Sequence, residues 1–552
     1  SDIRLKALEE ITGITPIYSL KEGITQKSFQ NYIMKALKFY QGHIQDEVPA
    51  SLLIKHHLIH KELALNLIHF PCNNDDIEEA LRYLKYEEFL KFQLTMQYIK
   101  LSRKKNIGVK KQFDQQILTQ FINQLPFKLT PDQNAAVDEI INDLKKDTIM
   151  YRFIQGDVGS GKTVVGAIGL YANYLAGFQG AMMAPTEILA SQHFKSLNIL
   201  FKETGINLAL LTGRLSNKEK QNIYQDLDSG KINIVVGTHA LFQDKVSYQK
   251  LGLVITDEQH RFGVNQRKAL KEKGQQVDFM VMSATPIPRT LAISLYGDMD
   301  VSTIKTMPTG RKKVITDVIK SHSMKPILNN LKKYLASGGQ CYVVCPLVAE
   351  SEVIDSRDTT SIYEGMKAYF KGNYEVGLLH GKMDDEVKEH IMEDFKNNQI
   401  QILVSTTVIE VGVDVSNANW MVIYNAERFG LSQLHQLRGR VGRGNEQGYC
   451  YLLSNSSSKE AIERLEFLKS CHDGFEVSYY DLKVRGPGDI LGNQQSGLPS
   501  LIIGDIFKDI NILEVSRKDA KELLESKSND AVYLKLISEI EEQLINNNKY
   551  ID

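Results

Sequence analysis

The sequence has few cysteines, no long apolar run and almost no excess of either charge. Its cysteines are odd in number and badly spaced for a zinc site: Cys72, Cys341, Cys345, Cys450 and Cys471. Cys341 and Cys345 lie in or beside an apolar stretch, which favours buried thiols and indicates a reducing compartment. No apolar run approaches the roughly 20 residues that a bilayer-spanning helix needs, and no signal peptide opens the chain. We therefore expect a cytoplasmic protein with no membrane association.

The formal net charge of −1 excludes a globally basic, histone-like DNA binder. It does not exclude nucleic acid, since a local basic stripe can contact phosphates while acidic surface elsewhere balances the total. The 552 residues are too many for a single core, so about three or four domains are expected.

One stretch organises the chain, GDVGSGKT at residues 156–163. It lies between a segment typical of a buried strand (150–155) and a segment of helical spacing (164–177), the setting of a phosphate-binding loop. Its glycines allow backbone N–H groups to face an anion. We expect Lys162 to reach the β/γ-phosphates of ATP and Thr163 to coordinate Mg²⁺, rather than a glycine-rich turn with a solvated lysine. The predicted nucleotide-binding residues are Gly156, Asp157, Val158, Gly159, Ser160, Gly161, Lys162 and Thr163.

Two acidic residues follow a second apolar segment, residues 251–255. Ligands bind at the carboxyl ends of strands in open α/β sheets, so these acids are candidates for the metal and the water. We expect Asp257 to hold Mg²⁺ and Glu258 to orient and deprotonate the attacking water. The alternative is a strand that ends in an exposed acidic turn.

A basic stretch near the end of the second half, residues 436–443, has arginines separated by glycines. Arg440 and Arg443, with Gln436 beside them, are predicted to neutralise charge on the transferring phosphoryl group as arginine fingers do. An exposed basic turn is the alternative. Placing these arginines on the lobe opposite Lys162 would make hydrolysis depend on closure of a cleft.

Residues 1–127 read as mostly helical, with a long aromatic-rich helix over residues 77–103 that we interpret as a packing strut. A basic cluster follows, which is interpreted as a solvated loop with DNA contact as the alternative: Lys100, Arg103, Lys104, Lys105, Lys110 and Lys111. Thr130 and Pro131 then start a helix that ends near Lys145. Gln133 in that helix is a candidate adenine reader, because an amide can pair with the adenine edge.

Apolar segments alternate with helical segments through the rest of the chain. The first series is predicted as strands over 180–185, 208–212, 232–237, 251–255 and 279–282, and the second over 341–345, 376–379, 400–404, 420–424 and 448–453. Such a series indicates a parallel sheet covered on both faces, and only the first half carries a phosphate loop. Two α/β lobes with one nucleotide site between them follow from this pattern. Residues 456–484 are predicted to form a helical hairpin that turns at Asp473-Gly474, and the last fifty residues are predicted as helix with a polar tail.

The order of motifs resembles superfamily 2 helicases: GDVGSGKT (156–163), APTEILA (184–190), GTHALFQ (237–243), DEQH (257–260), SATPIPRT (283–290), HGKM (380–383), STTVIEVGVDV (405–415) and QLHQLRGRVGR (433–443). DEQHRFG (257–263), SATPIPRT and RGPGDILGNQQSG (485–497) more closely resemble the RecG family of branch-migrating DNA helicases. The resemblance runs from about residue 15 to the C-terminus. It implies an α/β fold of two tandem RecA-like parallel-sheet lobes, with an N-terminal helical region and a C-terminal hairpin and translocation segment. The implied domains are residues 1–127, 128–308 (ATP-binding lobe), 309–455 (lobe with the arginine fingers) and 456–552.

The resemblance also implies roles by position. Residues matching motifs that contact the DNA backbone are Pro185, Thr186, Thr238, His239, Thr406 and Thr407, and those in the translocation segment are Arg485 and Gln495. Ser283 and Thr285 match the motif that couples hydrolysis to movement, and Gly412 and Asp414 match one that lines the nucleotide cleft. The implied cofactors are ATP and Mg²⁺. The implied partners are forks and Holliday junctions, with single-strand-binding protein as a further candidate, and the implied state is a monomer.

The sequence departs from the RecG pattern in one respect. The family carries an N-terminal OB-fold wedge domain that splits branched DNA, and we expect that nothing before Ile14 encodes such a barrel. ATP binding is expected to survive this loss, which leaves branch recognition and unwinding open. Beside an ATP-driven duplex translocase, two alternatives remain: a transcription-coupled repair or RNA-remodelling motor, and a DNA-binding scaffold that does not hydrolyse ATP.

Overall fold

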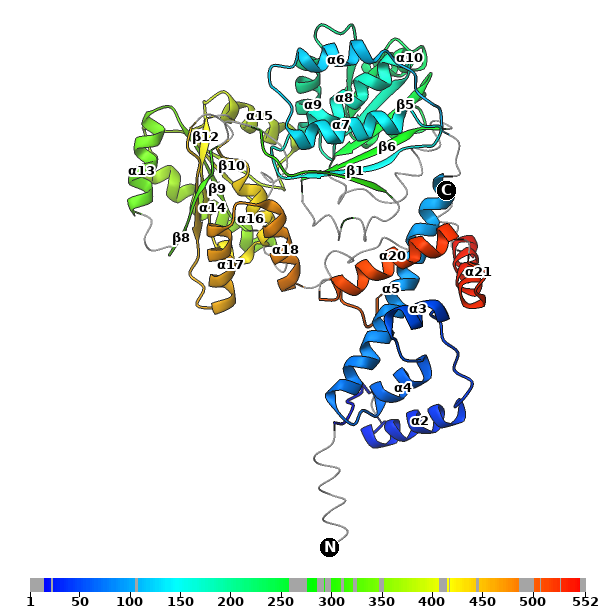
Figure 1. Ribbon diagram of the computed structural model, residues 1–552. Helices are drawn as coiled ribbons and strands as arrows, with labels where there is room; N and C mark the ends of the chain where they lie inside the picture. Colours follow the sequence, from blue (N-terminus) through cyan, green and yellow to red (C-terminus); the bar gives the residue numbers. More distant parts are fainter. Residues whose placement is uncertain are drawn as a thin grey trace. The chain divides into compact units, whose positions relative to one another are not determined.

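The computed structural model describes residues 14–20, 23–104, 108–257, 276–284, 292, 299–308, 312–320, 325–346, 352–406, 415, 417–442, 446–485, 501–506, 508–526 and 528–546. The chain divides into two compact units (Figure 1). The larger unit comprises residues 106–289 and 299–484, and the smaller comprises residues 1–105, 290–298 and 485–552.

The larger unit contains two parallel sheets, one in each lobe. The first has seven strands in the order β3-β4-β2-β5-β6-β1-β7. These are β1 (Tyr151–Gly156), β2 (Gln179–Met183), β3 (Leu208–Leu211), β4 (Ile234–Gly237), β5 (Leu251–Asp257), β6 (Asp278–Ser283) and β7 (Asp300–Ile304). The second has six strands in the order β10-β11-β9-β12-β13-β8. These are β8 (Ile315–Ile319), β9 (Gln340–Val344), β10 (Val376–Leu379), β11 (Ile402–Ser405), β12 (Ala418–Ile423) and β13 (Tyr449–Leu453). The prediction of two parallel α/β lobes is confirmed.

Helices cover both sheets because every crossover between parallel strands needs one (Figure 1). In the first lobe they are α6 (Gln115–Asn123), α7 (Pro131–Leu144), α8 (Lys162–Leu175), α9 (Glu187–Leu200) and α10 (Asn217–Asp228). In the second they are α13 (Lys325–Ala336), α14 (Glu352–Phe370), α15 (Asp385–Lys396) and α16 (Leu431–Arg438). Ile154, Val165 and Met282 are fully buried in the core of the first lobe, on β1, α8 and β6. The continuous apolar runs in the sequence are therefore central strands buried on both faces.

The predicted helical hairpin is confirmed. It consists of α17 (Lys459–Ser470) and α18 (Gly474–Arg485). At the turn between them, the Asp473 carboxylate accepts a hydrogen bond from the Phe475 N–H group at 2.7 Å. The two helices are joined by stacked rings of Phe467 and Tyr480, whose centroids lie 4.0 Å apart. A stacked aromatic pair of this kind adds about 1 kcal/mol beyond the area it buries.

The smaller unit is helical, as predicted for the N-terminal region. Its helices are α2 (Gln26–Phe39), α3 (Ala50–His56), α4 (Lys61–His69), α5 (Asn74–Lys104), α20 (Ile510–Ser526) and α21 (Ala531–Asn546). The predicted long helix is α5, about 46 Å long at 1.5 Å per residue, and Leu90 and Leu94 on it are fully buried. Helix α20 packs along α5, and Tyr86 of α5 donates to the buried carboxylate of Asp519 at 2.6 Å. The strut interpretation is confirmed, and the C-terminal helices are its packing partner.

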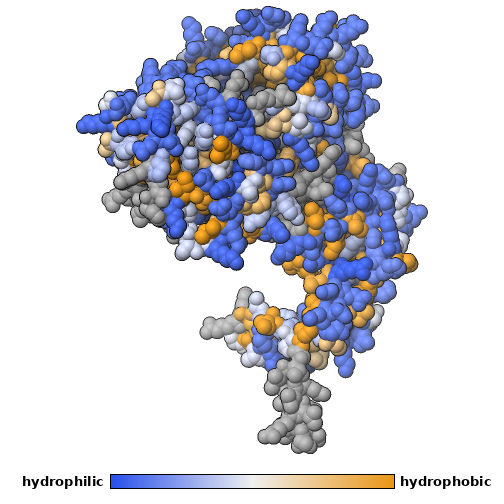
Figure 2. Space-filling view, turned by 60° about the vertical axis from the view of Figure 1, so that its left-hand side comes forward, coloured by the Kyte–Doolittle hydropathy of each residue, from blue (hydrophilic) through white to orange (hydrophobic). Residues whose placement is uncertain are grey.

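No helix among the described residues is long and apolar enough to cross a membrane. On the face drawn in Figure 2, hydrophilic residues cover most of the surface, and the apolar residues form separate small groups.

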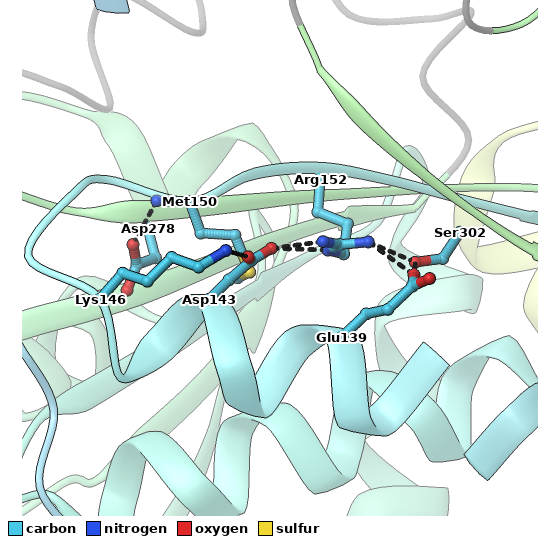
Figure 3. Close-up of polar contacts among 7 residues, drawn as sticks. All are labelled: Glu139, Asp143, Lys146, Met150, Arg152, Asp278 and Ser302. Carbon is cyan, nitrogen blue, oxygen red and sulfur yellow. Dashed lines mark hydrogen bonds and ion pairs between the residues drawn. The ribbon is translucent and has the colours of Figure 1, made fainter. Parts of the chain in front are cut away.

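Lys111 is not part of a solvated or DNA-contacting loop, which corrects the interpretation of the basic cluster. Lys111 is 2% exposed, and its side chain donates to the Gly252 carbonyl oxygen at 2.8 Å and to the Asp278 carboxylate. Asp278 also accepts a hydrogen bond from the Met150 N–H group at 2.7 Å (Figure 3). Burial lowers the pKa of Lys111 and raises that of Asp278, and the attraction between the two charges opposes both shifts. The pair thereby joins the segment before α6 to the amino-terminal ends of β5 and β6 and to Met150, the residue before β1.

Replacing Lys111 with methionine is expected to destabilise the first lobe by about 3 kcal/mol, because Asp278 keeps its burial and loses its cation. Chemical denaturation followed by circular dichroism measures the loss. Lys110→Met is the matched control, since Lys110 is exposed. Equal denaturation midpoints for Lys111→Met and Lys110→Met would contradict a stabilising role for the buried Lys111–Asp278 pair.

Candidate active site

The phosphate loop connects β1 to α8 in the predicted strand–loop–helix setting. Gly161 has φ +83°, and a Cβ there would lie 2.3 Å from the Gln133 side-chain nitrogen, so only glycine fits. Helix α8 begins at Lys162, and its first N–H groups therefore face the loop. The positive end of the helix and the loop amides form an anion-binding concavity.

Two polar groups of the loop fit a bound phosphate. The Lys162 ammonium group donates to the carbonyl oxygens of Gly156 at 2.8 Å and Asp157 at 3.0 Å, and it spans the loop. The Ser160 hydroxyl is buried and has no hydrogen-bond partner among the described residues. A buried hydroxyl without a partner is costly, and a phosphate oxygen would satisfy it. The residues present therefore fit the triphosphate of ATP.

Gln133 binds the phosphate loop in this structure. Its amide nitrogen donates to the Ser160 carbonyl oxygen at 2.8 Å, and its amide oxygen accepts from the Thr130 N–H group at 2.8 Å. Thr130 and Gln133 form a capping box at the start of α7, with Pro131 in the first turn as predicted. The interaction explains the presence of glutamine here without any base, so adenine reading remains a prediction.

Helix α7 is held on the sheet by a buried arginine (Figure 3). Arg152 of β1 pairs with Asp143 at 2.5 Å and with Glu139 at 2.7 Å, both on α7, and donates to Ser302 of β7 at 2.7 Å. This network fixes the helix that carries Gln133, and thereby the position of Gln133 beside the loop.

Asp257 ends β5, as the strand prediction required, and its carboxylate has a partner that sequence reasoning missed. The Nε2 atom of His193, on α9, lies 2.8 Å from an Asp257 carboxylate oxygen. Both side chains are largely buried. The signal in the sequence was a histidine three residues after the APTEILA motif, on the buried face of the helix that follows a neighbouring strand.

Helix α16 of the second lobe contacts the phosphate loop. A Cβ on Gly439 would lie 3.0 Å from Cβ of Val158. His435 is 2.8 and 2.9 Å from the two carboxylate oxygens of Asp157. Burial would raise the pKa of Asp157, but the hydrogen bonds from His435 and the Val158 N–H group outweigh it, so the pKa is below its ordinary value. The stretch that carries the predicted arginine fingers therefore lies against the phosphate loop at its amino-terminal end.

The helical hairpin also contacts this junction between α16 and the phosphate loop. Arg438 is 3% exposed and donates to the Leu468 carbonyl oxygen of α17 at 2.6 Å and to the His435 Nδ1 atom at 2.8 Å. Because Nδ1 accepts, Nε2 of His435 carries the proton that is donated to Asp157. A Cβ on Gly474, the first residue of α18, would lie 2.7 Å from that carboxylate, so the hairpin approaches to backbone distance. Asp157, His435, Arg438 and Leu468 form a continuous chain of hydrogen bonds from the loop to the hairpin.

The predicted DNA-contacting residues lie at the carboxyl ends of strands. Pro185 and Thr186 follow β2, and Thr186 caps α9 by accepting from the Leu189 N–H group at 3.3 Å. Thr238 follows β4 and is buried, whereas His239 is exposed. Thr406 follows β11, and its hydroxyl is buried without a partner among the described residues. Strands β2 and β4 end on the same edge of the first sheet as the loop and Asp257, and β11 ends on the carboxyl edge of the second sheet. Ligands of parallel sheets bind at such edges.

Several predicted residues lie outside the described part of the chain: Glu258, Thr285, Thr407, Gly412, Asp414, Arg443 and Gln495, together with the side chain of Arg485. Thr163, Gln436 and Arg440 are described and half-buried. The backbone N–H group of Arg440 donates to the Leu437 carbonyl oxygen at 2.9 Å, which continues the turn of α16 past Gly439.

Comparison with known proteins decides the family. The chain is 47% identical over 519 residues to the ATP-dependent DNA helicase RecG of Bacillus subtilis (strain 168), a match that covers 94% of this chain and 76% of the relative. The chain belongs to the RecG family of ATP-dependent DNA helicases. The RecG of Staphylococcus aureus (strain Mu50) is 46% identical over 517 residues, covering 93% of this chain and 74% of that one.

Other similarities agree with membership of the RecG family. Residues 130–293 match the DEAD/DEAH box helicase family, residues 326–445 the helicase conserved C-terminal domain, and residues 471–546 the C-terminal part of RecG domain 3. A solved structure of RecG bound to a three-way DNA junction is 42% identical and superposes with a TM-score of 0.73, covering 92% of this chain and 67% of that one. The chain is therefore an ATP-dependent DNA helicase.

Proposed function

We propose that this helicase is a double-stranded DNA translocase that remodels stalled forks and branch-migrates Holliday junctions. The observation that carries the proposal is the chain of hydrogen bonds from Asp157 through His435 and Arg438 to the hairpin carbonyl of Leu468. Because these groups touch each other directly, a change at the phosphate loop moves the hairpin that precedes the translocation segment. A RecG relative bound to a three-way junction supports branched duplex DNA as the substrate.

Within this proposal, each predicted residue has a role in the nucleotide site. Lys162 and the loop amides bind the β/γ-phosphates, Gln133 reads adenine, and Gly412 and Asp414 line the cleft. Thr163 and Asp257 would hold Mg²⁺, which supplies positive charge against the phosphate oxygens. Glu258 orients and deprotonates the attacking water. Arg440, Arg443 and Gln436 arrive from the second lobe, where Gly439 already contacts Val158.

DNA contact is proposed for the strand-end residues and the translocation segment: Pro185, Thr186, Thr238, His239, Thr406, Thr407, Arg485 and Gln495. Hydroxyls and loop amides suit contacts to phosphates that position a strand without reading its bases. Thr238 and Thr406 would act through their backbones unless the lobes rearrange, because their side chains are buried. We further propose a cytoplasmic monomer that meets single-strand-binding protein at forks.

The test compares stimulation of ATP hydrolysis by forked DNA, linear duplex and RNA, and follows fork regression on a gel. The expected result is stimulation by duplex DNA, strongest with branched substrates, and regression that requires ATP. Preference for RNA would instead favour an RNA-remodelling motor, and equal stimulation by linear duplex without regression would favour a transcription-coupled repair type. Nucleotide binding without turnover on any nucleic acid would favour a scaffold.

A further inference from the structure

Helix α9 has one buried polar side chain, His193, in an otherwise apolar inner face. The buried residues of this helix are Leu189, Ala190, His193 and Leu197, and the three apolar ones belong to the core of the first lobe. His193 is 8% exposed. A polar ring in such a row is expensive unless it is hydrogen-bonded, and its partner is Asp257.

The backbone brings these two residues together. Strand β2, which leads directly into α9, pairs with β5, and Met183 lies beside Thr256 in that register. Helix α9 therefore folds back over the end of β5, where His193 Nε2 lies 2.8 Å from the Asp257 carboxylate. The start of α9 is also anchored, because Glu187 accepts from the Gly213 N–H group at 2.7 Å and pairs with Arg214 at 2.8 Å. A helix tied down at its first turn holds the imidazole in place.

We propose that His193 is a positioning residue for the metal site, which fixes the orientation of the Asp257 carboxylate. The inference rests on the proposed role of Asp257 in holding Mg²⁺. A donor fixed to one carboxylate oxygen restricts rotation of the carboxylate, so less freedom is lost when it binds a cation or a cation-bound water. The alternative is a purely structural histidine, whose hydrogen bond to Asp257 only offsets the cost of burying a polar ring. The two interpretations predict different responses of nucleotide affinity to Mg²⁺.

The experiment measures equilibrium binding of a fluorescent ADP analogue to the full chain, with Mg²⁺ and with EDTA. His193→Leu keeps a similar volume without a donor, and His193→Gln returns an N–H donor. In His193→Leu the factor by which Mg²⁺ tightens ADP binding should fall about 10-fold or more. His193→Gln should restore most of it, and affinity in EDTA should stay unchanged in both variants.

Leu197→Ala is the matched control, since it loosens the same helix without touching Asp257. It should lower the melting temperature and leave the Mg²⁺ effect as in the unmodified chain. An unchanged Mg²⁺ effect in His193→Leu, or an equal loss in Leu197→Ala, would overturn the proposal. If His193→Leu does not fold, His193→Asn replaces it: its shorter amide does not reach the Nε2 position, so it should lose the Mg²⁺ effect that His193→Gln keeps.

Failure of the inference and failure of the proposed nucleotide site give different results. If Asp257 does not hold the metal, Asp257→Asn will keep the full Mg²⁺ effect. If Asp257→Asn loses the effect while His193→Leu keeps it, the metal site stands and only the positioning role of His193 fails.

Discussion

DNA-stimulated ATP hydrolysis should fall about 100-fold or more when Lys162 is replaced by alanine. The ammonium group lies across the phosphate loop, 2.8 Å from the Gly156 carbonyl oxygen, at the first residue of α8. A bound triphosphate would exchange these neutral partners for charged oxygens, whose hydrogen bonds are about twice as strong. Because negative charge moves toward the β/γ bridge during hydrolysis, the loss should appear in kcat as well as in KM. Phosphate release at saturating ATP and fork DNA measures it.

Lys202→Ala is the matched control, an exposed lysine of the same lobe that no motif includes. It should hydrolyse ATP at the normal rate. Glu258→Gln should show a comparable fall while still binding nucleotide, because it removes the proposed base and leaves the loop intact. Near-normal turnover in Lys162→Ala or Glu258→Gln would refute the assignment of the site.

Arg440→Ala should lower kcat about 1,000-fold or more, the range of an arginine finger, with little change in stability. Arg440 follows Gly439, which touches Val158 of the loop, and it is half-buried. Arg440→Lys should recover little of the activity, because an ammonium group lacks the planar fork of donors that grips phosphate oxygens. Single-turnover hydrolysis with saturating fork DNA separates the chemical step from nucleotide binding.

Arg438, two residues before Arg440, is expected to have a structural role instead of a catalytic one. Its guanidinium group is bonded to the Leu468 carbonyl oxygen and to His435, so Arg438→Met should destabilise the second lobe by about 2 kcal/mol. Fluorescence of Trp420, in the sheet of that lobe, reports the transition during denaturation. If Arg440→Ala unfolds as readily as Arg438→Met while retaining turnover, Arg440 is structural and the finger assignment fails.

The sequence predicted the central strands and two of the four edge strands, β3 and β10, but it missed the other two. Residues 251–255 and 279–282 read as strands because both faces of β5 and β6 are buried, which produces unbroken apolar runs. Strands β7 and β8 carry Asp300, Ser302 and Asp317 and lie at sheet edges, where one side lacks a neighbour and polar residues are tolerated. Their pattern is therefore weak, and only pairing with β1 and β13 reveals them.

The same contrast holds for charged and polar side chains. Lys111 looked like its exposed neighbours in a basic cluster, because the sequence around it contains no sign of Asp278, 167 positions away. His193 and His435 were likewise ordinary within their helices. Each became significant only when folding placed it against a carboxylate from a distant segment, Asp257 and Asp157 respectively.

By itself, the sequence determined the two parallel α/β lobes, the phosphate loop with its lysine, and the acid at the end of β5. These features are encoded locally, in glycine spacing, in apolar runs and in the turn after a strand, so a short window contains them. Only the tertiary structure decided which partners the charged groups have, and that α16 and the hairpin meet the loop through His435 and Arg438. Such contacts join residues tens to hundreds of positions apart. Their geometry depends on the packing of complete strands and helices, which no short window of sequence contains.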